Sequence, residues 1–203
     1  HMIEKIVAVV VASLFAYINF RGAEETGTAG IIVTAIKLVI LGLFVIFGVL
    51  ATVQQPNWPA QFLSRPEFAP AGIAGILGAM GFTFIAFEGY EIIVQSGEEV
   101  VNPGETIPKA VFYSLIIVVP IYVLVAFSVI GGLEVTPRIL EIAYPEGAIP
   151  EQTPFVWEVL GSLGETGLVR AAGQFMPYGV ILLIVAGLAS TTSALNATVY
   201  SSS

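Results

Sequence analysis

The sequence predicts an all-α integral membrane protein, and three observations support this. Of its 203 residues, 56% are hydrophobic and only 11% are charged, whereas soluble domains carry about 25% charged residues. The mean hydropathy is +0.91. Long apolar segments recur along the chain, and in lipid only helices and closed barrels satisfy their own backbone hydrogen bonds. The runs are too long for the short alternating strands of a barrel. We therefore expect a multi-pass protein of the lipid bilayer, most simply of the cell (plasma) membrane.

Five apolar segments are predicted to be membrane helices: residues 6–20, 29–53, 70–96, 110–133 and 174–200. The second is long enough to cross a hydrocarbon core of about 30 Å. The third is interrupted by two glutamates and a glycine, and the fourth contains Pro120.

The connections between these segments differ in character. Residues 21–30 are predicted to form a short polar turn, and residues 54–69 carry aromatic side chains typical of the membrane interface. Residues 134–170 form the longest connection, in which residues 155–160 are predicted to form a short interfacial helix.

The acidic connection 97–109 carries helix-boundary signals. Asn102-Pro103 is predicted to end the preceding helix, because the residue before a proline avoids the α region. Thr106 is predicted to cap the next helix, with Pro108 in its first turn.

The composition argues against several functions. With no cysteine in the chain, disulfides and cysteine-rich metal sites are excluded. The net charge of −8 argues against nucleic acid as a partner. The sequence has no glycine-rich phosphate loop, no Ser/His/Asp set and no metal-spaced cluster, so we expect neither an enzyme nor a cofactor. His1 precedes Met2 and is interpreted as a terminal remnant rather than a ligand.

The most informative feature is the run Ile85-Ala86-Phe87-Glu88-Gly89-Tyr90-Glu91 inside the third apolar segment. A carboxylate at bilayer depth costs about 2.5–3.5 kcal/mol on insertion scales and marks a functional site by default. Glycine weakens a helix at the same point. The run therefore predicts a helix broken at Phe87-Glu88-Gly89-Tyr90, as in transporters whose substrate sites lie at interrupted helices near the midplane.

Three motifs together resemble the amino acid–polyamine–organocation (APC) permeases. The first is Phe87-Glu88-Gly89-Tyr90-Glu91 followed by Gly97-Glu98-Glu99-Val100-Val101-Asn102-Pro103 and Ile107-Pro108. The second is Asn19-Phe20-Arg21-Gly22 followed by Thr34-Ala35-Ile36-Lys37-Leu38. The third is Ala186-Gly187-Leu188-Ala189-Ser190-Thr191-Thr192-Ser193-Ala194-Leu195-Asn196.

This resemblance implies helices four to eight of a five-plus-five inverted-repeat (LeuT-like) transporter fold. Residues 1–203 would then be a single transmembrane domain fragment: 1–53 ends the first repeat, 54–69 is the external loop between repeats, and 70–203 begins the second. The partners implied are the missing helices of the same transporter. The resemblance also places residues 97–109 in the cytoplasm and 134–170 outside, although the few basic residues favour the opposite orientation.

The function implied is secondary active transport of amino acids or related amines by alternating access. Backbone carbonyls at Ile85, Ala86, Phe87 and Glu88, beside Gly89, would hold the amino group of the substrate. The alternative for Gly89 is a packing kink. Glu88 departs from the family pattern, in which this position is apolar or small, and so favours a cationic substrate.

Tyr90, Glu91, Lys37 and Ser190 are the candidates for gating or proton coupling. Glu88 and Glu91, three residues apart, can share one proton, or one can lie in a watery vestibule while the other forms a salt bridge. By resemblance Lys37 stands where sodium-coupled relatives bind the ion, and Ser190 supplies one hydroxyl where they have two. The alternative for Lys37 is snorkelling to the interface. Transport is thus expected to be proton-linked or sodium-independent exchange.

Two other functions remain open. One is a permease of the same fold for another small solute, and the other is a membrane scaffold subunit without transport.

Overall fold

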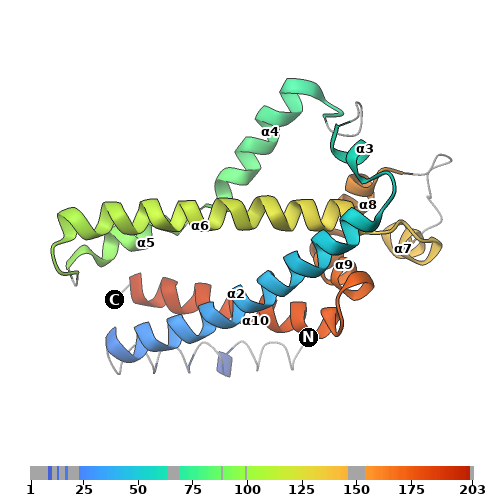
Figure 1. Ribbon diagram of the computed structural model, residues 1–203. Coiled ribbons are helices and arrows are strands. Elements are labelled where there is room, and N and C mark those ends of the chain that lie inside the picture. Colours follow the sequence, from blue (N-terminus) through green and yellow to red (C-terminus); the bar gives the residue numbers. More distant parts are fainter. Residues whose placement is uncertain are drawn as a thin grey trace. The chain divides into compact units, whose positions relative to one another are not determined.

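The computed structural model describes residues 9–10, 13, 17, 23–63, 69–87, 89–98, 100–145 and 154–201. Every regular element in these residues is a helix (Figure 1), which confirms the all-α prediction. The chain divides into two compact units. The first comprises His1–Ile40, Phe87–Ile117 and Val185–Ser203, and the second comprises Leu41–Ala86 and Val118–Ile184.

The α-helices that can be bounded are α2 (Ala23–Gln54), α3 (Trp58–Leu63), α4 (Gly72–Ile85), α5 (Tyr90–Gln95), α6 (Pro103–Gly132), α7 (Pro137–Ala143), α8 (Val156–Leu163), α9 (Gly167–Phe175) and α10 (Gly179–Ser201). Single 3₁₀ turns follow α5 and α8, at Ser96–Glu98 and Gly164–Thr166.

Two of these helices, Gly30–Gln54 and Pro103–Gly132, are long and apolar enough to cross a membrane. Shorter apolar helices lie at Gly72–Ile85 and Gly179–Leu195. These four correspond to the last four predicted segments. The first predicted segment, residues 6–20, lies almost entirely outside the described residues.

Several predicted boundaries are wrong. The polar stretch from Ala23 to Ala29 belongs to α2 instead of forming a turn, because Glu24 and Glu25 are compatible with the first turn of a helix. Likewise, Asn102-Pro103 begins α6 rather than ending the helix before it. Proline suits the first helical position, where its missing N–H would have no partner.

The start of α6 explains why Thr106 does not cap it. Asn102 adopts a left-handed conformation with φ 53°, and its carbonyl accepts from the amides of Glu105 and Thr106. Thr106 itself lies inside the helix and donates its hydroxyl to the Val101 carbonyl at 2.9 Å. The helix therefore starts seven residues earlier than the apolar segment suggests.

The connection 134–170 contains more structure than the one short helix predicted within it. Helix α7 begins after Thr136, whose hydroxyl accepts from the Ile139 amide at 3.4 Å, with Pro137 in the first turn. Helix α8 begins after Phe155, whose amide donates to the Glu158 carboxylate at 2.8 Å. Helices α7 and α8 pack around four buried side chains: Ile139, Ala143, Val159 and Leu163.

The predicted last span also begins in the wrong place. Residues 174 and 175 belong to α9, and α10 begins only at Gly179. Tyr178, with φ 56°, turns the chain between the two helices. The apolar pattern runs through this turn, so hydropathy alone could not reveal it.

The core of the second unit is a close crossing of α2 and α6. Gly48 and Gly131 leave no room for a β-carbon: one at Gly48 would collide with the Ser128 side chain, and one at Gly131 with the Thr52 side chain. Thr52 and Ser128 are fully buried. Small residues let helix backbones approach in a membrane, where van der Waals contact replaces the hydrophobic effect as the driving force.

Polar groups in this crossing are satisfied within it. The Thr52 hydroxyl donates to the Gly48 carbonyl at 2.8 Å, and the Ser128 hydroxyl donates to the Val45 carbonyl at 3.4 Å. Beside them the fully buried Phe44 ring lies against Phe175 of α9, with centroids 5.1 Å apart. The hydroxyl groups buried in the crossing are therefore both hydrogen-bonded to backbone carbonyls.

Candidate functional site

The third apolar segment is interrupted as predicted, but Tyr90 already belongs to the following helix instead of to the break. Helix α4 ends at Ile85, and helical structure resumes at Tyr90 in α5. The Ala86 amide donates to the Thr83 carbonyl at 3.0 Å, so the last turn of α4 is tightened to the i→i+3 pattern. The backbone thus leaves the helix in the middle of an apolar stretch.

Gly89 carries the conformation that makes this interruption possible. Its φ is +110°, in a region that side-chain-bearing residues rarely adopt. No atom lies within 4 Å of the position a β-carbon would take. Glycine is therefore required here for backbone freedom and not for close packing.

The carbonyl of Ala86 projects from the end of α4 and has a donor from another helix. The Tyr122 hydroxyl, on α6, donates to this oxygen at 2.8 Å. In an unbroken helix the same oxygen would accept from the amide four residues later. Tyr122 thus replaces a backbone donor that the interruption removes.

The end of α4 is suited to a cation. The carbonyl end of a helix carries about half a negative charge, and its last carbonyls lack intrahelical donors. Ile85 is 59% exposed and Ala86 is exposed as well, while Phe87 and Gly89 are half-buried. Helix α4 has no buried residue among those described, so its carbonyl end is accessible to a ligand.

The predicted acidic residues can be placed only in part. Tyr90 and Glu91 form the first turn of α5, which places their backbone directly after the interruption. Their side chains, and Glu88 altogether, lie outside the described residues. The sharing of a proton between Glu88 and Glu91 stays a prediction.

The amino acid permease family matches the chain over residues 1–203. The chain belongs to this family.

Three relatives illustrate the match. An uncharacterized protein of Methanocaldococcus jannaschii is 29% identical over 191 residues, which cover 94% of this chain and 37% of the relative. A branched-chain amino acid permease of Lactococcus lactis is 30% identical over 128 residues, or 62% and 27% of the two chains. Cationic amino acid transporter 4 of Homo sapiens is 31% identical over 153 residues, or 74% and 21%.

This chain therefore spans well under half the length of the curated relatives it matches. No solved structure matches it. Membership of a family of transporters agrees with the expectation of a membrane protein that is not an enzyme.

The two remaining predicted site residues lie on long helices. Lys37 is half-buried on α2, and Ser190 is exposed on α10. Among the described residues the one ion pair joins Lys109 to Glu105, so Lys37 has no carboxylate partner there. No described contact joins Lys37 to Ser190, and their joint role stays a prediction.

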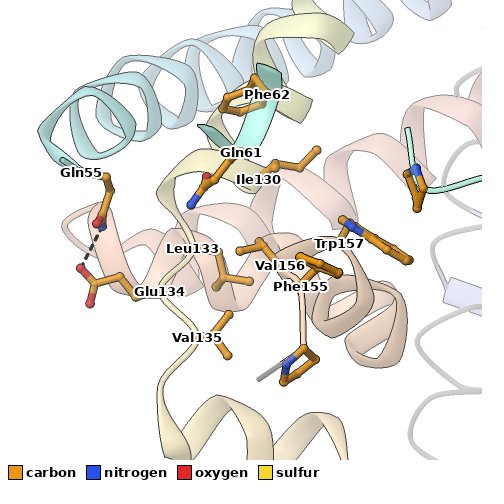
Figure 2. Close-up of a pocket in the computed structure, with 12 residues that line it drawn as sticks. Gln55, Gln61, Phe62, Ile130, Leu133, Glu134, Val135, Phe155, Val156 and Trp157 are labelled. Carbon is orange, nitrogen blue, oxygen red and sulfur yellow. Dashed lines mark hydrogen bonds between the residues drawn. The ribbon is translucent and has the colours of Figure 1, made fainter. Parts of the chain in front are cut away.

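A pocket of about 730 Å³ in the second unit was not anticipated (Figure 2). Gln55 and Glu134, joined by a 3.1 Å hydrogen bond, lie on one side of it, and Phe155 and Trp157 lie on another. The full lining comprises Gln55, Gln61, Phe62, Pro70, Ile130, Leu133, Glu134, Val135, Pro154, Phe155, Val156 and Trp157. None of the predicted site residues takes part. We take the interruption as the candidate site because a helix ends there inside an apolar segment and Gly89 adopts a positive φ.

Tyr122 is the site residue that sequence reasoning missed. It lies two residues after Pro120 in a span, where aromatic residues commonly serve only for packing. A tyrosine hydroxyl at bilayer depth needs an acceptor, and this was the available signal. Its acceptor lies 36 positions earlier in the chain, which no local pattern reveals.

Proposed function

We propose that this chain forms part of a secondary transporter for amino acids or related amines that works by alternating access. The observation that carries the proposal is the interruption between α4 and α5 in a member of the amino acid permease family. Relatives named as branched-chain and cationic amino acid transporters support the substrate class.

The proposed binding group is the carbonyl end of α4. The carbonyls of residues 85–88 accept from the substrate ammonium group, and the helix dipole adds to the attraction. Gly89, with its positive φ, keeps the backbone beside these carbonyls out of helical geometry. Helices outside this chain complete the site for the carboxylate.

The proposed architecture is the five-plus-five inverted repeat of the LeuT-like fold. Residues 1–53 end the first repeat, 54–69 join the repeats outside the membrane, and 70–203 begin the second. The cell membrane is the proposed location.

Coupling is proposed to be independent of sodium, with Lys37 as the proton-sensitive element. An ammonium group among apolar neighbours in a span is costly, and no described carboxylate offsets its charge. Gain or loss of its proton therefore stabilises one arrangement of the surrounding helices over another.

The experiment is uptake of radiolabelled amino acids by the full-length protein in proteoliposomes. Competition by a panel of amino acids, amines and unrelated solutes identifies the substrate class. Uptake competed only by an unrelated solute indicates a permease for another substrate, and no uptake of any solute indicates a scaffold.

Coupling is tested in the same vesicles by exchanging sodium for choline. Lys37→Ala should abolish uptake, and Lys37→Arg should do so as well, because arginine does not deprotonate. Lys109→Ala, which removes the exposed partner of Glu105, is the matched control and should transport normally. Strong stimulation by sodium, or normal rates in Lys37→Ala, contradicts the assignment.

A further inference from the structure

The hydrogen bond from Tyr122 to Ala86 takes one of the two lone pairs of an oxygen atom that the proposed function assigns to the substrate. The donor–acceptor distance of 2.8 Å lies at the most common value for O–H···O bonds. Both residues belong to the second unit, so the bond is internal to one compact body.

A phenol and an ammonium group that approach the same lone pair of this oxygen compete for it unequally. The phenol brings one neutral donor, whereas a primary ammonium brings three charged ones. Charge-assisted hydrogen bonds are about twice as strong as neutral ones. The partial negative charge at the carbonyl end of α4 favours the cation further.

The surroundings of the bond allow an exchange. Tyr122 is 42% exposed and Ala86 is exposed, so the bond lies at the surface of the described residues and not inside a packed core. An uncovered carbonyl in lipid would be unfavourable. A donor that covers the Ala86 carbonyl before substrate binds, and that can move away afterwards, therefore stabilises the site.

We propose that the Tyr122 hydroxyl is a built-in substitute for the substrate ammonium group. It covers the Ala86 carbonyl while the transporter is empty and yields that oxygen to an N–H donor when substrate binds. The proposal rests on the proposed function and adds to it a competing residue and a chemical requirement. Ligands that carry N–H donors displace Tyr122, and ligands whose nitrogen is fully methylated do not.

The test compares wild type, Tyr122→Phe and Tyr113→Phe in the full-length protein in nanodiscs. Tyr122→Phe removes the hydroxyl and keeps the ring. Tyr113→Phe makes the same change on an exposed tyrosine of the same helix. Equilibrium binding is measured with a transported amino acid and with its N,N,N-trimethyl derivative, and exchange rates are measured in proteoliposomes.

Removal of the competitor should tighten binding of the amino acid by about 3- to 10-fold, the range that corresponds to one net hydrogen bond. The exchange rate should fall, because release of substrate no longer recovers the bond to Tyr122. Affinity for the trimethyl derivative should not change, and Tyr113→Phe should match wild type with both ligands.

Weaker or unchanged binding in Tyr122→Phe, while wild type and Tyr113→Phe bind normally, overturns this inference and leaves the proposed function intact. Equal tightening for both ligands also overturns it, since it indicates added space instead of a freed acceptor. No amino acid binding in any of the three proteins overturns the inference and the proposed function together.

Discussion

The α2–α6 crossing is stabilised by close packing, whereas the interruption after α4 depends on backbone conformation and a hydrogen bond from another helix. At the crossing, Gly48 and Gly131 face side chains that leave no space for one more carbon atom, and the polar groups of Thr52 and Ser128 are buried and bonded. At the interruption, a glycine with open space around it holds an unusual backbone angle, and a hydroxyl from another helix covers an exposed carbonyl.

The two regions therefore meet different requirements, stability at the crossing and ligand binding at the interruption. A close-packed contact tolerates almost no change in volume, whereas a site that must bind and release a ligand needs groups whose partners can change. Substitutions at the crossing should therefore alter stability, and substitutions at the interruption should alter binding and transport.

The largest effect is expected from Gly48→Leu. The new side chain must enter space filled by Ser128, and overpacking of this kind costs about 1–3 kcal/mol or more. We expect loss of monodisperse protein on size exclusion in detergent. Gly42→Leu is the control on the same helix, because no atom lies within 4 Å of its β-carbon position. Similar yields of the two variants would show that the crossing is not close-packed.

Gly89→Leu should abolish substrate binding without unfolding the protein, and Gly89→Ala should do nearly the same. The reason is the φ of +110°, which costs a non-glycine residue about 1–3 kcal/mol whatever its size. Binding of a radiolabelled amino acid and Tm are the measurements. Gly81→Ala, inside α4, is the control and should retain both. Normal binding in Gly89→Ala with loss only in Gly89→Leu would indicate a steric role instead.

A smaller effect is expected from Glu91→Gln. A carboxyl group that exchanges a proton during the cycle makes the transport rate depend on pH, and an amide cannot exchange one. Initial uptake between about pH 5 and pH 8 should therefore become flatter. Glu98→Gln, an exposed residue in the turn after α5, should keep the wild-type profile. An unchanged profile in Glu91→Gln removes this residue from the proton pathway.

The smallest effect is expected at an exposed contact, where the Gln174 side chain forms two hydrogen bonds with the backbone of Glu134, at 2.8 and 3.0 Å. Gln174→Met should lower the free energy of unfolding by about 1–2 kcal/mol and Tm by a few degrees. Gln55→Met removes a single bond to the exposed Glu134 carboxylate and should cost less. Transport by the folded protein should be normal in both, and loss of activity at unchanged Tm would contradict the division of roles.

The helical class and the approximate position of the interruption could be predicted from the sequence because they depend on local residue patterns. Low charge and long apolar runs predicted a helical membrane protein, and Glu88-Gly89 marked the place where α4 stops. The early starts of α2 and α6 were missed because helix caps and charged first turns extend past the apolar segment. The turn at Tyr178 was missed because hydropathy continues through it.

The contacts that complete the site and the core could not be predicted in the same way. Tyr122 meets Ala86 across 36 positions, and Ser128 meets Val45 across 83. Such pairs depend on how helices lie against one another. The family resemblance implies roles for single residues, but it does not predict which oxygen atom accepts a hydrogen bond from a given hydroxyl group.

The paired bonds between Gln174 and Glu134 have a consequence for how this chain can vary. They join two residues 40 positions apart, so the ends of the intervening segment, which contains α7, α8 and α9, are held together without a covalent bond. We call this segment, residues 134–174, the excursion. Closing a chain segment of that length costs entropy that grows only slowly with its size. The part of the excursion that carries α7 and α8 should therefore tolerate a change in length while the two bonded positions stay fixed, whereas α9 is tied to the α2–α6 crossing through Phe175.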